Sequence, residues 1–243
     1  MQKTQTDKIV LSCAPHHHDK EKFMAVGIYG EFRHLAFCRF GDDKWSDIPT
    51  SRLTGFGDVT FHEDKIYALD FRGYLHEFNT KRVPFQRTTI TPPPHGIPFL
   101  DDTTAYNRYT VWNPEGDLLF VIRHFQFGNG NGDKKGECYR TSRFLIYKFN
   151  KNAKEWSQES SLGDYVLLLG FNSSTWMPPF SDEQGNWVLN CIYYTDDNLI
   201  SRCTEQVIGG HDVGIFNLQD ENITPIFPNS YFLHPPPIWV WRQ

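Results

Sequence analysis

The sequence predicts an all-β protein, and three observations favour that class. Aromatic residues make up 16% of the 243 residues, and their side chains fit the pleated, half-buried surface of a sheet. Short apolar runs recur along the chain without sustained helical periodicity. Eighteen Gly and fifteen Pro supply the turns between these runs. Together these features predict a β-propeller-like array of about four four-stranded antiparallel blades.

The clearest blade is predicted between residues 56 and 91. It contains four strand-like runs separated by turn residues, which are Asp58–Phe61, Lys65–Asp70, Tyr74–Phe78 and Phe85–Ile90. Four consecutive hairpin-linked strands make one propeller blade. The same order of runs predicts further blades over residues 9–49, 108–160 and 165–228, followed by a tail at 229–243. We expect one domain over 1–243, with a β-sandwich with long loops as the alternative.

The predicted repeat is longer than that of compact propellers. Each third strand ends in an apolar residue and a turn residue, and an apolar residue opens the fourth, as in Phe78 with Phe85 and Phe149 with Trp156. The distance between such positions exceeds the ~40–50 residues of compact repeats. The excess lies in three inserted segments, Thr91–Asn107, Gln126–Thr141 and Asp196–His211.

Composition and charge exclude several classes of partner. The net charge is −5 and no basic run exceeds two residues, so we expect no nucleic-acid partner. Apolar stretches are shorter than the ~18–20 residues that span a bilayer, so we expect no membrane partner. The five cysteines lack close pairs and the first eight residues are polar, which favours reduced thiols in a cytoplasmic or nuclear protein.

Motifs that could carry chemistry have simpler interpretations. The histidines of His16–Asp19 are adjacent and would not converge on a metal, and Gly128–Gly132 lacks the Lys and helix of a phosphate loop. Asp101-Asp102 and Asp196-Asp197 are explained by turn chemistry. Pro92–Pro94 is interpreted as a stiff link between blades. We therefore predict no catalytic residue, no cofactor and no metal site.

Several sequence patterns, taken in order, resemble one known family. The patterns are Leu35–Trp45, Phe144–Asn150 with Trp156, Leu168–Ser174, Asn190–Asp197, Asp212–Leu218 and Pro235–Trp239. In that order they resemble the plant F-box/kelch-like family with the KIB-type β-propeller domain. The resemblance extends from about Ile9 to Trp239.

The resemblance implies a role in ubiquitination. In this family an F-box docks on the Skp-type adaptor of a cullin-based ubiquitin ligase, and the propeller holds the protein to be ubiquitinated. We expect no F-box helices before Ile9, an N-terminally truncated or partial propeller, and hence no docking of this chain on the adaptor. The family implies no set of catalytic residues.

The predicted function is that of a non-catalytic protein-interaction module with a protein partner of unknown identity. We predict that the polar segment Gln126–Thr141 contacts the partner through Phe127 and Tyr139, because aromatic residues are enriched in interface hot spots. One alternative is a propeller enzyme or sugar-binding protein, in which carboxylates and aromatic rings would converge on a central pocket. Another is a truncated family member without function.

Overall fold

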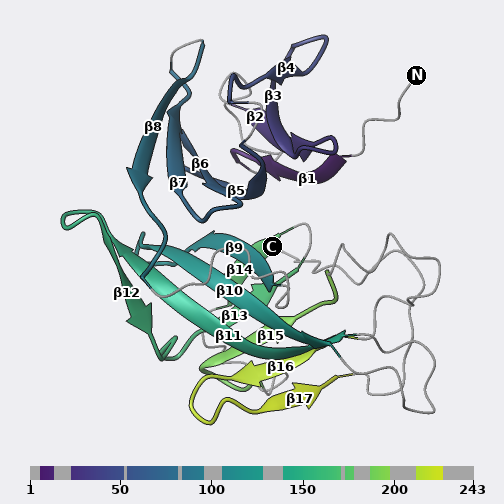
Figure 1. The fold of residues 1–243 in the computed structure, drawn as a ribbon, viewed down its shortest axis with the longest axis vertical. Coiled ribbons are helices and arrows are strands. Elements are labelled where there is room, and N and C mark those ends of the chain that lie inside the picture. Colours follow the sequence, from purple (N-terminus) through teal and green to yellow (C-terminus); the bar gives the residue numbers. More distant parts are fainter. Residues whose placement is uncertain are drawn as a thin grey trace. The chain divides into compact units, whose positions relative to one another are not determined.

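A computed structural model describes residues 6–13, 23–51, 54–81, 84–95, 106–127, 139–170, 173–177, 187–197 and 212–226, and every regular element in these ranges is a β-strand (Figure 1). The predicted all-β class is confirmed. The chain forms two compact units, residues 1–100 with 149–157 and residues 101–148 with 158–243. That residues 1–243 make one domain stays a prediction. His16–Asp19, Asp101-Asp102 and Gly128–Gly132 lie outside the described residues, as does the tail beyond 226.

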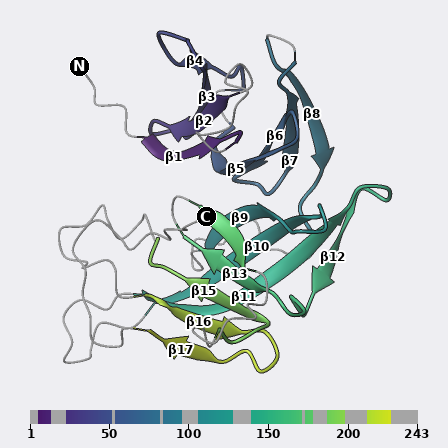
Figure 2. The same ribbon diagram turned by 180° about the vertical axis from the view of Figure 1, so that it is seen from behind.

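The first unit contains two four-stranded antiparallel sheets in chain order (Figure 2). One consists of β1 (Thr6–Leu11), β2 (Met24–Tyr29), β3 (His34–Arg39) and β4 (Ser46–Asp47). The other consists of β5 (Phe56–His62), β6 (Lys65–Asp70), β7 (Leu75–Asn79) and β8 (Gln86–Thr91). These sheets coincide with the first two predicted blades.

Alternating apolar residues hold these two sheets together. Every second residue of a strand points to the same face of its sheet. The buried residues are accordingly Val26 and Ile28 on β2, Leu35 and Phe37 on β3, and a matching set on β5 to β8, all in one apolar cluster. The first unit therefore has a sheet-on-sheet core.

A third sheet has the order β12-β11-β10-β9. Its strands are β9 (Tyr106–Trp112), β10 (Leu118–Phe127), β11 (Tyr139–Asn150) and β12 (Glu155–Glu159). The fourth sheet has five strands, β13 (Val166–Leu169), β14 (Ser174–Met177), β15 (Cys191–Tyr194), β16 (Gly214–Asn217) and β17 (Ile223–Pro225). Side chains of β9, β10 and β11 pack in one apolar cluster with those of β13, β15 and β16.

The fourth sheet differs from the expected run of antiparallel hairpins. β15 pairs with β13 in parallel, and β14 pairs with the other edge of β13. A parallel pair needs a crossover of a dozen or more residues, which the segment between Leu169 and Cys191 provides. β15 begins only at Cys191, because Asn190 has a left-handed backbone (φ 56°) and its side-chain oxygen accepts the Leu162 N–H at 2.7 Å.

Gly73, in the turn between β6 and β7, offers a test of the packing in the first unit. Its φ is +81°, and a Cβ there would lie 2.9 Å from the Cβ of Pro93. Gly73→Ala should lower the free energy of unfolding by about 2–3 kcal/mol, through backbone strain and this clash. Gly41→Ala is the control, because Gly41 has a φ of +89° with nothing within 4 Å of the added Cβ. In urea unfolding, the control variant should lower the free energy of unfolding by only about 1 kcal/mol. Equal losses would show that Pro93 does not constrain the turn.

Candidate functional site

In the second unit, residues from at least one end of each predicted insertion lie around a single arginine. Arg123 lies on β10 and is fully buried, with 0% of its surface exposed. It is bonded to Thr141, where the second insertion ends, and to Asp197 and Asp212, which lie at the start and just past the end of the third. Asn107, where the first insertion ends, donates to the carboxylate of Asp197 at 2.9 Å. We call these residues, with Tyr109, Tyr139, Thr195 and Asp196, the Arg123 cluster.

The guanidinium of Arg123 uses all three of its nitrogens. Nε donates to the hydroxyl of Thr141 at 2.7 Å. Nη1 donates to the Thr195 carbonyl and to Oδ1 of Asp197, both at 2.7 Å. Nη2 donates to the carbonyl and to Oδ2 of Asp212, both at 3.0 Å. This planar fork therefore fixes the chain on both sides of the segment 198–211.

Neutral hydrogen-bond donors also bind the carboxylates of the Arg123 cluster. The hydroxyl of Tyr109 donates to Asp197 at 2.5 Å, and that of Tyr139 donates to Asp196 at 2.7 Å. Asp212 accepts the backbone N–H of Thr141 at 2.9 Å and its hydroxyl at 2.7 Å. Since buried carboxylates are stable only when bonded in this way, the cluster ties β9, β11 and the ends of β15 and β16 together.

The charges of neighbouring groups keep the guanidinium of Arg123 protonated. Burial alone would lower the pKa of Arg123, but the carboxylates of Asp197 and Asp212 raise it well above its ordinary value. Burial, together with the charge of Asp197, raises the pKa of Tyr109, so its phenol remains a donor. The guanidinium carbon also lies 4.4 Å from the ring centre of Tyr194. The side chains of the Arg123 cluster thus bind one another, and the cluster is suited to fixing the backbone segments that carry them.

The explanation of Asp196-Asp197 by turn chemistry is wrong, because neither residue lies in a turn. Both are buried, with Asp212 beside them, because each has a donor within the cluster. One sequence feature indicated the site. Leu119, Val121 and Arg123 alternate along β10, so Arg123 continues the face that enters the core, and a charge on that face requires buried partners.

The two predicted contact residues lie at the ends of one insertion. Phe127 is the last residue of β10 and pairs with Tyr139, the first residue of β11. Tyr139 is buried, and its ring meets that of Phe125 edge-on at 5.7 Å. Tyr139 is therefore held within this unit by its own contacts. Contact of Phe127 and Tyr139 with a partner stays a prediction.

His124, next to Arg123, gives the second unit a pH dependence. Burial, with a smaller contribution from Arg143, lowers the pKa of His124 to about 4. The unfolded chain binds this proton near pH 6.5. As the pH falls from 6.5 to 4, the unfolded state therefore binds more protons and the melting temperature should fall. His124→Phe should flatten this dependence, whereas His34→Gln should not. Parallel curves for His124→Phe and the unaltered chain would contradict it.

Within the described ranges, His, Cys, Asp and Glu form no group that could hold a metal ion. No helix among these residues could span a membrane. Cys13, Cys38 and Cys191 are free thiols.

Four small sheets of four or five strands define a protein of the β-propeller class. The KIB1-4 beta-propeller family matches over residues 1–217, and the chain belongs to that family. The family resemblance inferred from the sequence is confirmed.

Curated relatives agree with this assignment. A protein of Arabidopsis thaliana that is named for an F-box, At5g55150, is 24% identical over 220 residues, which are 87% of this chain and 54% of that protein. F-box protein At4g35733 of the same plant is 25% identical over 209 residues, covering 85% of this chain and 52% of the relative. The chain thus spans about half the length of the curated relatives it matches.

Proposed function

We propose that this chain is a non-catalytic protein-interaction module whose contact surface is formed by its three insertions. The observation that carries the proposal is that the Arg123 cluster holds residues at the ends of all three. Segments whose ends are fixed lose less entropy when they bind, because part of the ordering is already present. Binding residues are also concentrated on loops that a rigid scaffold positions.

The partner is inferred to be a protein destined for ubiquitination. Support comes from the relatives that are named as F-box proteins and share the propeller region of this chain. In this proposal the chain positions its partner and performs no bond chemistry. The Skp-type adaptor is not expected to bind residues 1–243, because the F-box is the adaptor's docking element in the family.

Co-purification from plant tissue tests this function. The tagged chain should recover a specific protein that is itself ubiquitinated in the plant. Exchange of residues 128–138 for a Gly/Ser segment of equal length, between Phe127 and Tyr139, should abolish recovery. Substitution of the exposed turn Gln219–Glu221 in the same unit is the matched control and should leave recovery unchanged. Full recovery after the exchange would refute contact through this insertion.

One observation favours the alternative of a sugar-binding protein. A hollow of about 290 Å³ in the second unit is lined by the carboxylates Glu115, Asp117 and Glu159 and by the rings of Tyr165 and Trp176. Aromatic rings and carboxylates are suitable platforms for a sugar. Binding of a plant oligosaccharide, lost in Trp176→Ala and measured by calorimetry, would favour this alternative over protein recognition.

A further inference from the structure

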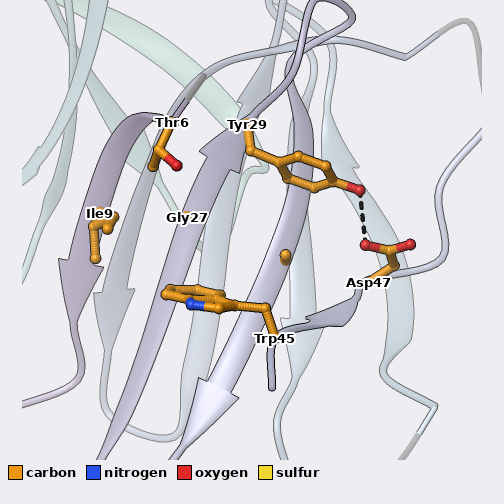
Figure 3. Close-up of a pocket in the computed structure, with 7 residues that line it drawn as sticks. Thr6, Ile9, Gly27, Tyr29, Trp45 and Asp47 are labelled. Atoms are coloured by element: carbon orange, nitrogen blue, oxygen red, sulfur yellow. Dashed lines mark hydrogen bonds between the residues drawn. The ribbon is translucent and has the colours of Figure 1, made fainter. Parts of the chain in front are cut away.

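The sheet β1–β4 carries a hollow whose floor consists of very small residues. Register places Ile9, Gly27, Ala36 and Asp47 in one row across the four strands. Gly27 and Ala36 occupy the centre of the row, and the hollow above them has a volume of about 260 Å³ (Figure 3). A Cβ at Gly27 would lie 3.5 Å from the Trp45 ring, which shows how closely that ring covers the floor.

Two aromatic rings and one carboxylate surround this hollow. Figure 3 shows Tyr29 and Trp45 on opposite sides of it, with Asp47 at one end. The hydroxyl of Tyr29 donates to Oδ1 of Asp47 at 2.7 Å, which orients the carboxylate. Within the described part of the chain, Lys and Arg form no ion pair with Asp47. The negative charge therefore faces the hollow without a cation from these residues.

Trp45 differs from the aromatic residues at the corresponding positions of the next two sheets. Phe78 and Phe85 are buried, and the rings of Phe149 and Trp156 lie 5.1 Å apart. In the first sheet, by contrast, the side chain of Trp45 is 45% exposed. At the corresponding position, Phe85 of the second sheet is buried and Trp156 of the third is partly buried, so Trp45 is the most exposed of these three rings.

We propose that this hollow binds the side chain of an arginine on a partner protein. A guanidinium stacks on aromatic faces and pairs with a carboxylate, so it satisfies Trp45, Tyr29 and Asp47 together. The hollow of about 260 Å³ is large enough for one arginine side chain.

An apolar occupant fits less well. It would desolvate the carboxylate of Asp47 without supplying a donor, and burying an unpaired charge is costly. A lysine would supply the charge but not the planar group that stacks. This site lies in the first unit and does not depend on the insertions, so it goes beyond the proposed function and can fail separately from it.

Titration with capped tripeptides tests the proposal. Gly-Arg-Gly should shift the indole N–H resonance of Trp45 in NMR spectra, saturably and at about millimolar concentration. Gly-Lys-Gly should bind about two-fold to five-fold more weakly, and Gly-Gln-Gly should not bind. Equal binding of the glutamine peptide, or no binding of the arginine peptide, would overturn the proposal.

Variants identify the atoms responsible. Asp47→Asn should weaken binding of Gly-Arg-Gly about two-fold to five-fold, whereas Asp43→Asn, which removes an exposed charge nearby, should not. Gly27→Ala should abolish binding with the fold intact, because its Cβ makes ordinary contacts of 3.4–3.7 Å and occupies the floor. If Asp47→Asn and Asp43→Asn weakened binding of the peptide equally, the peptide would be attracted by general negative charge and not by the carboxylate of Asp47.

Occupation of the hollow by other parts of the protein is a contrary outcome. If a second copy covered it, sedimentation would show a dimer that Trp45→Ala dissociates. If further chain of the protein covered it, the Trp45 indole N–H would be protected from exchange in the free protein. Either result would overturn the proposal, whereas a monomer with rapid exchange at this indole supports it.

Discussion

Arg123→Met is expected to lower the free energy of unfolding by about 3–5 kcal/mol. Methionine matches the arginine stem in length, but it leaves the carboxylates of Asp197 and Asp212 buried without their cation. Breaking a buried ion pair from one side is costly for this reason, whereas exposed pairs contribute little. The loss should appear as a lower urea midpoint of the second unit.

Two further variants separate charge from packing. Arg143→Met removes an exposed arginine from β11 and should change stability by no more than about 0.5 kcal/mol. Adding Asp197→Asn and Asp212→Asn to Arg123→Met should restore part of the stability, because no charge then remains unpaired. If Arg123→Met and Arg143→Met had equal stability, the Arg123 cluster would not hold the unit together.

Lys8→Met should have the largest effect in the first unit, about 3 kcal/mol. Lys8 on β1 and Asp58 on β5 form a buried ion pair that joins the two sheets. Removal of the lysine takes its ion-pair partner away from the carboxylate of Asp58, which is 2% exposed, and leaves the charge of Arg33 still acting on it. Chemical unfolding followed by circular dichroism measures the loss.

The matched control for this pair is Lys65→Met. Lys65 pairs with Glu77 at 3.0 Å in the same unit, but the two side chains are 38% and 23% exposed, so the loss should stay below about 1 kcal/mol. The double variant Lys8→Met with Asp58→Leu should recover most of the stability, since an apolar pair can replace a buried ion pair. No recovery would contradict the view that the loss in Lys8→Met comes from the charge of Asp58.

Much of the fold could be predicted from the sequence, because local patterns determine these strands. The predicted run Lys65–Asp70 coincides with β6, and the runs Tyr74–Phe78 and Phe85–Ile90 differ from β7 and β8 by one residue. The parallel pairing of β13 with β15 could not be predicted, because it depends on a crossover and on the conformation of Asn190. Both features lie outside any single strand.

The candidate site was less accessible to sequence reasoning. The three insertions were identified, but not that residues at their ends meet at one arginine. Contacts such as Arg123 with Asp212 join residues far apart in the chain, and no short motif records such pairs. The hollow at Trp45 was missed for a related reason, since the repeat that contains Trp45 does not indicate which copy is exposed.

The central claim is that the Arg123 cluster organises the insertions into one binding surface. The most direct test uses Arg123→Lys, which keeps the charge but loses the planar fork. The amount of the plant protein that co-purifies with this variant is compared with the amount that co-purifies with the unaltered chain. We predict that Arg123→Lys, compared at a temperature where it is folded, recovers far less of that protein, whereas Arg143→Lys recovers as much as the unaltered chain. Equal recovery by folded Arg123→Lys and the unaltered chain would contradict the account.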